Sequence, residues 1–392
     1  MDRQALVASA QQPSPTENQA VDTRLISEAW DLINRSYVDR SVVQPQQLTY
    51  AAIRGMAEAL GDTGHTRFLT PEAVQERSNS MHGVSDGIGI SVENQGGRTV
   101  ILVALDGSPA QLAGLKPGDI ILSVDGVKVD GLAASQISRR LLGPAGTSVR
   151  LTIRDAKTGS SRGLTVARAR ITLHNVTWAL IPGTSIAEIR VAHFSQGVAQ
   201  DLQAALAQVQ AQGATGIILD LRNDPGGSLN EAIGVASQFL GSGNVLEEKD
   251  AQGATTAIPV RPGGVATDLP LVVLINRGTA SASEIVASAL QEAHRAQLAG
   301  VTTFGTGTVL RRFGLSDGSA LLLATREWLT PSGQSFWHKG IVPDVPVAEP
   351  ASALPIIPEA LTEMSSAELR ASADLQLFKG LELLGQPLPQ PP

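Results

Sequence analysis

The segment Gly278-Thr279-Ala280-Ser281-Ala282-Ser283-Glu284-Ile285 follows a buried apolar run from Leu271 to Ile275. It opens a helical pattern that we extend from Ala282 to Ala299. A short apolar run that passes through a polar turn into a helix is typical of an α/β domain. The segment therefore predicts an α/β core and puts a candidate nucleophile, Ser281, at a strand-to-helix turn. Ser281 and Glu284 also match the pattern of a helix capping box, and the two interpretations are compatible.

Strands and helices alternate before this segment. Apolar runs predict strands at 186–191 and 216–221, and helical periodicity predicts helices at 198–212 and 229–240. A further strand is expected at 319–325. This order predicts a mainly parallel sheet in the core, because helices join parallel strands.

Outside the core, three other patterns divide the chain. Between residues 83 and 170, β-branched runs are split by Gly, Pro and Asp, which predicts a small β-rich domain. Residues 21–82 carry two amphipathic helical patterns, around Leu25 to Ile33 and Ile53 to Leu60. We therefore expect five regions: a disordered or post-leader segment at 1–20, an N-terminal helical region at 21–82, the β-rich domain at 83–170, the α/β core at 171–350, and a C-terminal helix at 366–384 within a tail at 351–392 that ends disordered.

Composition excludes several classes of function. The 37 acidic and 30 basic residues give a net charge of −7 without a basic block, which argues against nucleic acid as the main partner. The chain has no cysteine, so disulfides, thiolate metal sites and cysteine nucleophiles are excluded. None of the six histidines has the close spacing of a zinc helix motif, and we expect no metal and no cofactor. No apolar segment of signal-peptide length is visible, so the chain is either cytoplasmic or follows a removed leader.

The β-rich region resembles a PDZ domain. The resemblance is carried by Gly87-Ile88-Gly89-Ile90, Ser108-Pro109-Ala110 and Gly118-Asp119-Ile120-Ile121-Leu122-Ser123-Val124-Asp125-Gly126 at that spacing. The first block implies a loop whose backbone N–H groups bind a free C-terminal carboxylate while the peptide adds as a strand. Taken alone, Gly87 and Gly89 are equally typical of a tight strand entry.

The rest of the chain resembles the carboxyl-terminal processing proteases, also called tail-specific proteases. The matching segments are Gly61 to Pro71, Asp220 to Gly227, Thr279 to Glu284, Trp328 to Gly333, and Gly340 to Asp344. The resemblance implies a crotonase-like α/β core, a PDZ domain inserted after an N-terminal helical region, and an extracytoplasmic setting, periplasmic or secreted. It also implies protein substrates bound through their C-terminal tails, and terminal helices that serve a homo-oligomer or cage the site.

The resemblance implies the roles of the site residues. The family nucleophile corresponds to Ser281. Peptide attack places negative charge on the carbonyl oxygen, which two backbone N–H groups must already face. The family's donors correspond to Ala282 and to Gly226 or Gly227 of the Pro-Gly-Gly turn.

The residue that should take the proton of the serine is missing. In the family this base is a lysine in a Phe-Gly-Lys-Gly turn, and the matching turn here is Phe304-Gly305-Thr306-Gly307. Thr306 follows Ser281 by 25 positions, which is the family spacing. Leu310 occupies the position of a Gln that usually supports the lysine. A threonine hydroxyl does not act as a proton acceptor near neutral pH.

Two neighbouring residues are candidates for a substitute base. Histidine suits this role because its unperturbed pKa lies near neutrality, which favours His338, and Lys339 is the candidate among the lysines. Lys249 is a second lysine to consider, whereas His294 is expected to face solvent and His65 to join a hydrogen-bonded turn. The alternative is that Trp337-His338-Lys339 is an ordinary strand and turn surface.

Two hypotheses follow for the function. The first is a serine endopeptidase that captures C-terminal tails through the PDZ domain and cleaves with Ser281 and an unusual base, at a reduced rate. The second is a pseudoprotease that binds C-terminal peptides as an adaptor without cleaving them.

Overall fold

The protein is described here by a computed structural model for residues 22–62, 66–95, 97–105, 108–116, 118–132, 134–156, 158–348 and 355–386. The chain divides into two units, residues 1–59 and 60–392. The first unit contains α1 (Thr23–Ser36), the 3-10 helix η1 (Arg40–Val42) and α2 (Pro45–Glu58), and no residue of α1 is buried. Both predicted amphipathic helices are therefore present. The expected leading segment at 1–20 and the chain end at 387–392 lie outside the described residues.

The β-rich region of the second unit forms an antiparallel sheet in the order β3-β4-β5-β7-β8, with β6 paired to β5. Isoleucines such as Ile101, Ile121 and Ile137 are fully buried in its own hydrophobic core. A two-stranded ladder, β2 with β9, lies at its start and end. The elements are β2 (Val84–Gly87), β3 (Ile90–Gln95), β4 (Arg98–Ala104), α4 (Pro109–Leu112), β5 (Ile120–Val124), β6 (Val127–Lys128), α5 (Ala134–Leu141), β7 (Ser148–Arg154), β8 (Ser161–Ala167) and β9 (Ala169–Thr172).

The α/β region is built on a six-stranded sheet in the order β10-β11-β12-β15-β16-β19. Its strands are parallel except for the antiparallel pair β10 and β11, as expected for a mainly parallel core. The elements are β10 (Val176–Leu180), β11 (Ile186–Val191), α6 (Val198–Ala211), β12 (Gly216–Asp220), α7 (Leu229–Phe239), β15 (Leu271–Ile275), α8 (Ala282–Glu292), β16 (Gln297–Gly300) and β19 (Val345–Pro346). The predicted α/β fold class is confirmed.

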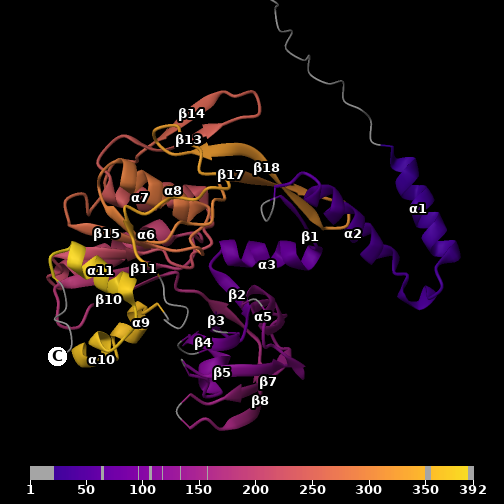
Figure 1. Ribbon diagram of the computed structural model, residues 1–392, viewed down its shortest axis with the longest axis horizontal. Coiled ribbons are helices and arrows are strands. Elements are labelled where there is room, and N and C mark those ends of the chain that lie inside the picture. The colour runs from indigo at the N-terminus through magenta and orange to yellow at the C-terminus, as the bar shows by residue number, and fades with distance from the viewer. Residues whose placement is uncertain are drawn as a thin grey trace, which may run out of the picture. The chain divides into compact units, whose positions relative to one another are not determined.

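Helices cover both faces of this sheet (Figure 1). Alternate strand residues such as Leu219 and Val273 pack with α6, α7 and α8, while their neighbours Ile218 and Leu274 pack with the C-terminal helices. These helices are α9 (Pro358–Leu361), α10 (Ser366–Arg370) and α11 (Leu375–Leu383). Burial on both faces explains why the central strands are continuous apolar runs.

A second sheet carries the strands β1-β18-β13-β14, with β17 also paired to β18. Helix α3 (Pro71–Met81) follows β1, with Pro71 at its start and Thr70 as its N-cap. The strands are β1 (Arg67–Leu69), β13 (Asn244–Lys249), β14 (Thr255–Pro259), β17 (Thr308–Gly314) and β18 (Ala320–Leu329).

Two element predictions are wrong. The helix after Ser281 ends at Glu292 rather than Ala299, because His294 has a φ of 50° and the chain then forms β16 beside β15. The expected single tail helix at 366–384 is split into α10 and α11, since Asp374 begins a new helix as its N-cap. None of the helices in the described ranges is long and apolar enough to span a membrane.

Candidate active site

Four loops meet at one edge of the six-stranded sheet. Because β11, β12, β15 and β16 run parallel, the loops 192–197, 221–228, 276–281 and 301–306 all follow strand ends on the same side. In open α/β sheets this carboxyl edge is where ligands bind. Four of the core positions singled out from the sequence, Gly226, Gly227, Ser281 and Thr306, lie in these loops.

Ser281 occupies a strained turn at the start of α8. It is the N-cap of the helix, with φ 60° and ψ −118°, a conformation that a residue with a side chain seldom adopts. Its N–H donates to Oε2 of Glu284 at 2.8 Å, and the residue is partly exposed. Strain of this kind persists only where surrounding contacts hold it, and it is concentrated at functional sites.

The Pro-Gly-Gly turn lies directly against Ser281. A methyl group added to Gly226 would lie 2.7 Å from Ser281 Cβ and 2.5 Å from Ala280 O. A methyl group added to Gly227 would lie 2.4 Å from Phe194 O. Both glycines have positive φ, 89° and 151°, so only glycine fits here.

The N–H groups of the Pro-Gly-Gly turn and of Ala282 differ in whether they have a hydrogen-bond acceptor in the protein. The Gly226 N–H donates to Oδ1 of Asp224 at 2.8 Å. Within the residues that the structure describes, the N–H groups of Gly227 and Ala282 donate to no protein acceptor. The two donors expected from the sequence are therefore left open at Gly227 and Ala282, and not at Gly226.

A single carboxylate joins Ser281 to the 303–306 turn. Glu284 is fully buried, and its Oε1 accepts the Thr303 hydroxyl at 2.5 Å and the Gly305 N–H at 2.6 Å. Its Oε2 accepts the N–H groups of Ser281 at 2.8 Å and Thr306 at 2.9 Å. Burial raises the pKa of Glu284, although these four hydrogen bonds act in the opposite direction. The position of Thr306 relative to Ser281 is thus set through one side chain.

Thr306 and Leu310 are the residues expected from the sequence at the positions of the family lysine and its supporting glutamine. Thr306 is buried, 5% exposed, and Leu310 is partly buried beside a bulge of β17 where it pairs with Ala324. Neither side chain is a proton acceptor near neutral pH.

The backbone of the expected substitute bases touches the same turn. The His338 N–H donates to Gly305 O at 2.9 Å, and a methyl group on Gly305 would lie 2.9 Å from Lys339 N. Both side chains are exposed, and the His338 ring stacks on Trp337 with centroids 4.8 Å apart. The structure therefore brings both residues to the turn.

The other candidates lie elsewhere. Lys249 Nζ pairs with Glu327 Oε2 at 3.0 Å in the second sheet, away from the four loops at the carboxyl edge. Burial alone would raise the pKa of Glu327. Hydrogen bonds from Ser335 and Lys249 and the charges of Lys249 and Lys339 outweigh it and hold this pKa below its usual value. His294 is exposed and lies just beyond α8, and His65 falls outside the described residues.

The proposed carboxylate loop of the β-rich domain borders a small apolar cavity of about 70 Å³. Gly87, Ile88, Gly89 and Ile90 line it on one side, and Leu141 of α5 lies on another. The carbonyls of Ile88 and Gly89 accept the N–H groups of Ala110 and Leu105, both at 2.9 Å.

The sequence and the fold of this chain match those of known proteins. Residues 185–347 match the model of peptidase family S41, and residues 100–155 match that of the PDZ domain. The carboxyl-terminal-processing protease of a Synechocystis species is 36% identical over 384 residues, which cover 93% of this chain and 87% of the relative. The chain belongs to the carboxyl-terminal processing proteases of family S41.

Two further members of the family agree. The chloroplastic C-terminal processing peptidase of Tetradesmus obliquus is 31% identical, covering 84% of this chain and 78% of the relative. A solved structure described as a photosystem II D1 C-terminal processing protease superposes with a TM-score of 0.55 and 31% identity, covering 88% of this chain and 97% of its own. The predicted resemblance to the carboxyl-terminal processing proteases and to a PDZ domain is confirmed.

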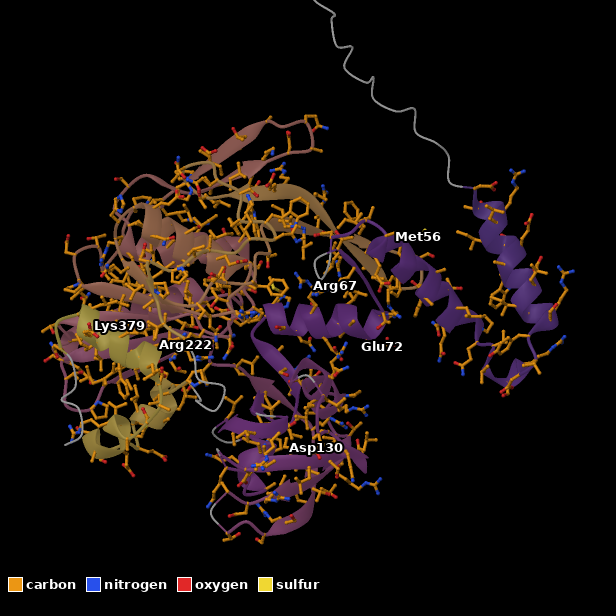
Figure 2. The ribbon with its side chains drawn as sticks, in the orientation of Figure 1. Met56, Arg67, Glu72, Asp130, Arg222 and Lys379 are labelled. Carbon is orange, nitrogen blue, oxygen red and sulfur yellow. The ribbon has the colours of Figure 1, made fainter. Side chains whose placement is uncertain are left out.

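A buried ion cluster below the site of this S41 chain ties the core to the C-terminal helices. Arg222 is fully buried and binds Asp220 at 2.9 Å and Asp374 at 2.8 Å (Figure 2 shows it close to α11, which carries Lys379). Glu188 also lies within 3.8 Å of Arg222, and burial raises the pKa of Glu188 well above its usual value, with the charge of Asp220 adding to the effect. The Asp-Leu-Arg segment of the family motif therefore has a structural role.

Sequence analysis missed one histidine at the carboxyl edge of the sheet. His193 Nε2 lies 3.0 Å from the hydroxyl of Ser80 in α3, and its Nδ1 is buried without a partner. Burial and the charge of Arg77 lower the pKa of His193 to about 4. Its only signal in the sequence is its place just after a buried strand, which does not distinguish it from the other histidines.

Proposed function

We propose that this chain is a serine endopeptidase that binds protein C-terminal tails through its PDZ domain and cleaves them with Ser281. The observation that carries the proposal is the strained Ser281 turn, packed against Gly226 and flanked by the open N–H groups of Gly227 and Ala282. Donors placed in advance around a future oxyanion are the largest single contribution in acyl transfer.

In this mechanism Ser281 Oγ bonds to the substrate carbonyl carbon, and its proton passes to a base. The negative charge on the carbonyl oxygen is held by the N–H groups of Ala282 and Gly227. The C–N bond then breaks, the amine leaves with the proton, and water hydrolyses the acyl ester. With Thr306 and Leu310 at the family positions, His338 or Lys339 serves as the base, and the rate is lower by about 10² to 10⁴ than with a well-placed base.

The same proposal covers how substrates are bound. The loop Gly87 to Ile90 binds the substrate carboxylate, and the cavity of about 70 Å³ receives its last side chain. A cavity this small favours a small apolar terminal residue. The partners are therefore protein tails, without nucleic acid or metal.

The proposal extends to architecture and setting. We assign residues 21–82 to an N-terminal helical region, 83–170 to the inserted PDZ domain, 171–350 to a crotonase-like core and 351–392 to the C-terminal tail. Exposed apolar residues such as Leu25 and Leu32 of α1 suit a homo-oligomer built through the terminal helices. The relatives that are named chloroplastic or that process the photosystem II D1 protein support an extracytoplasmic location.

The second candidate is a pseudoprotease that binds C-terminal peptides as an adaptor. It is favoured by one observation, that Thr306 and Leu310 stand where the resemblance places the lysine and its supporting glutamine. In that case the PDZ groove keeps its function and Ser281 acts only as a helix cap.

One experiment separates the two. The protein and its Ser281→Ala variant are incubated with an unfolded substrate that ends in an apolar tail, and products are identified by mass spectrometry. Cleavage that is lost only in the variant supports the endopeptidase, whereas equal inertness of both supports the adaptor. Thr306→Lys, alone and with Leu310→Gln, then shows whether a base is all that the scaffold lacks, because activity rises in that case. Substitution of each of the six histidines in turn locates a histidine base.

A further inference from the structure

A second buried acid, Asp224, lies between the Pro-Gly-Gly turn and the Ser281 segment. Its Oδ1 accepts the Gly226 N–H at 2.8 Å, and its main-chain oxygen accepts the Ala280 N–H at 2.9 Å. The Ser283 hydroxyl donates to the same main-chain oxygen at 3.1 Å. Asp224 therefore contacts residues on both sides of Ser281 and one residue of the turn that faces it.

The surroundings of Asp224 favour a neutral side chain. The residue is 0% exposed, and its Oδ2 is buried without a hydrogen-bond partner. Among the described residues no Lys, Arg or His lies within ion-pair distance of it. A buried carboxylate without a cation is strongly disfavoured, and such a group holds its proton instead.

The charges near Asp224 agree with this conclusion. Burial raises the pKa of Asp224 well above its usual range, against the hydrogen bond from the Gly226 N–H and the charge of Arg190 in β11. The carboxylate of Asp220 in β12 acts in the same direction as burial. The element α8 contributes only the neutral hydroxyl of Ser283 among these groups.

We propose that Asp224 is a positioning residue that, as a neutral acid, holds the Gly226 N–H away from Ser281 and leaves the Gly227 N–H free for the oxyanion. The inference rests on the proposed endopeptidase function. Asp224 gives up no proton during the reaction. If it ionised, its charge would oppose the negative charge that develops on the substrate oxygen beside the same turn.

This predicts a specific pH dependence. Because the active form is protonated, activity falls as the pH rises through the pKa of Asp224. A unit charge several Å from the oxyanion, at an effective dielectric constant of about 20, lowers the rate by roughly 10- to 100-fold. Asparagine keeps the acceptor oxygen and cannot ionise, so Asp224→Asn removes this alkaline decline. Asp224→Ala removes the acceptor and lowers kcat by about tenfold or more with little change in KM.

The first test measures kcat and KM against pH for the wild type, Asp224→Asn and Asp224→Ala. Asp119→Asn is the matched control, since Asp119 is also buried and accepts the N–H groups of Lys116 and Ala156 at 3.1 Å, but in the PDZ domain. The expected result is that both Asp224 variants lose the alkaline decline while Asp119→Asn keeps it, and that only Asp224→Ala also lowers kcat. An unchanged decline in Asp224→Asn, or full kcat in Asp224→Ala, overturns the proposal.

The second test does not depend on turnover. Amide spectra of protein labelled with ¹⁵N-glycine are recorded across pH for the wild type and Asp224→Asn. The Gly226 and Gly227 resonances shift with a single titration well above the ordinary aspartate range in the wild type, and this titration is absent in the variant. Titration near the ordinary aspartate range, or glycine resonances that ignore the substitution, overturns the inference. A wild type that neither cleaves tails nor reacts at Ser281 refutes the endopeptidase instead, and the spectra still decide the state of Asp224.

Discussion

Replacing Gly226 with alanine tests whether the Pro-Gly-Gly turn sets the position of Ser281. The added methyl group would lie 2.5 Å from Ala280 O, 2.7 Å from Ala282 N and 2.7 Å from Ser281 Cβ. Ordinary carbon contacts begin near 3.5 Å, so the turn or the serine segment has to move by roughly 0.5–1 Å. A displacement of about 1 Å at a reacting centre lowers the rate on the order of 100-fold.

A second glycine separates this contact from the cost of backbone strain. Gly243 has a φ of 92°, close to the 89° of Gly226, but an added methyl group there would meet nothing within 4 Å. Alanine at either position costs about 1–2 kcal/mol for the positive φ, which lowers Tm by about 1–3 °C in a chain of 392 residues. Only Gly226→Ala should also change the chemistry at Ser281.

The assay is the rate at which a fluorophosphonate probe labels Ser281, together with kcat/KM on a peptide substrate and thermal unfolding. We expect labelling and cleavage to fall about 100-fold in Gly226→Ala and to stay near the wild-type rates in Gly243→Ala. Labelling of Gly226→Ala at the rate of Gly243→Ala would refute the reasoning, because the turn would then not position the serine.

Three other predictions test other parts of the molecule. A methyl group on Gly89 would lie 2.4 Å from the nearest side-chain carbon, so Gly89→Ala should weaken binding of a peptide with a free apolar C-terminus at least about tenfold by fluorescence anisotropy, with the amidated peptide as background. Equal affinity would argue against this loop as the binding site. Arg222→Met leaves Asp374 and Glu188 without their cation, although Asp220 keeps Arg190, and should lower the free energy of unfolding by about 3–5 kcal/mol in urea; a loss below about 1 kcal/mol would contradict the role of the cluster. His193, with a pKa lowered from 6.5 to about 4 by burial and the charge of Arg77, is neutral when folded while the unfolded chain binds a proton, so stability should fall as the pH drops from 6.5 towards 4. This loss is at most about 3 kcal/mol, and a His193→Gln variant with the same change in urea midpoint between pH 7 and pH 5 would show that another group is responsible.

The elements that the sequence predicts well are those whose residues are buried on both sides. β15 was predicted with its exact bounds, because each of its five residues is buried and the run is continuous. The end of α8 was not, because Ala296, Leu298 and Ala299 continue an apolar pattern after it. That pattern belongs to β16, whose pairing with β15 is a long-range contact that local periodicity does not contain.

Charged strands were missed for a related reason. Glu247, Glu248 and Lys249 follow one another in β13, where no apolar alternation marks a strand. They become a strand because each pairs with a residue of β18. Their extended conformation is therefore a property of the second sheet rather than of the segment.

In the candidate site, the sequence motifs identify the candidate residues but not the hydrogen bonds between them. Gly226, Ser281 and Thr306 come from three separate loops, and the sheet order brings them to one edge. The hydrogen bonds of Glu284 and the burial of Asp224 follow from that order, so neither was predictable from spacing alone. The sequence also left open whether Gly226 or Gly227 is the candidate oxyanion donor, because only the structure shows that the Gly226 N–H already donates to Asp224.

The way in which Thr306 is held has a consequence for how this site changes during evolution. Its main-chain N–H, and not its side chain, is bound by Glu284, so this hydrogen bond does not depend on the chemistry of the side chain at position 306. A different side chain at position 306 therefore changes the chemistry of the turn while Glu284 still binds its main chain. Such a substitution leaves in place the link through Glu284 between the Ser281 and Thr306 segments.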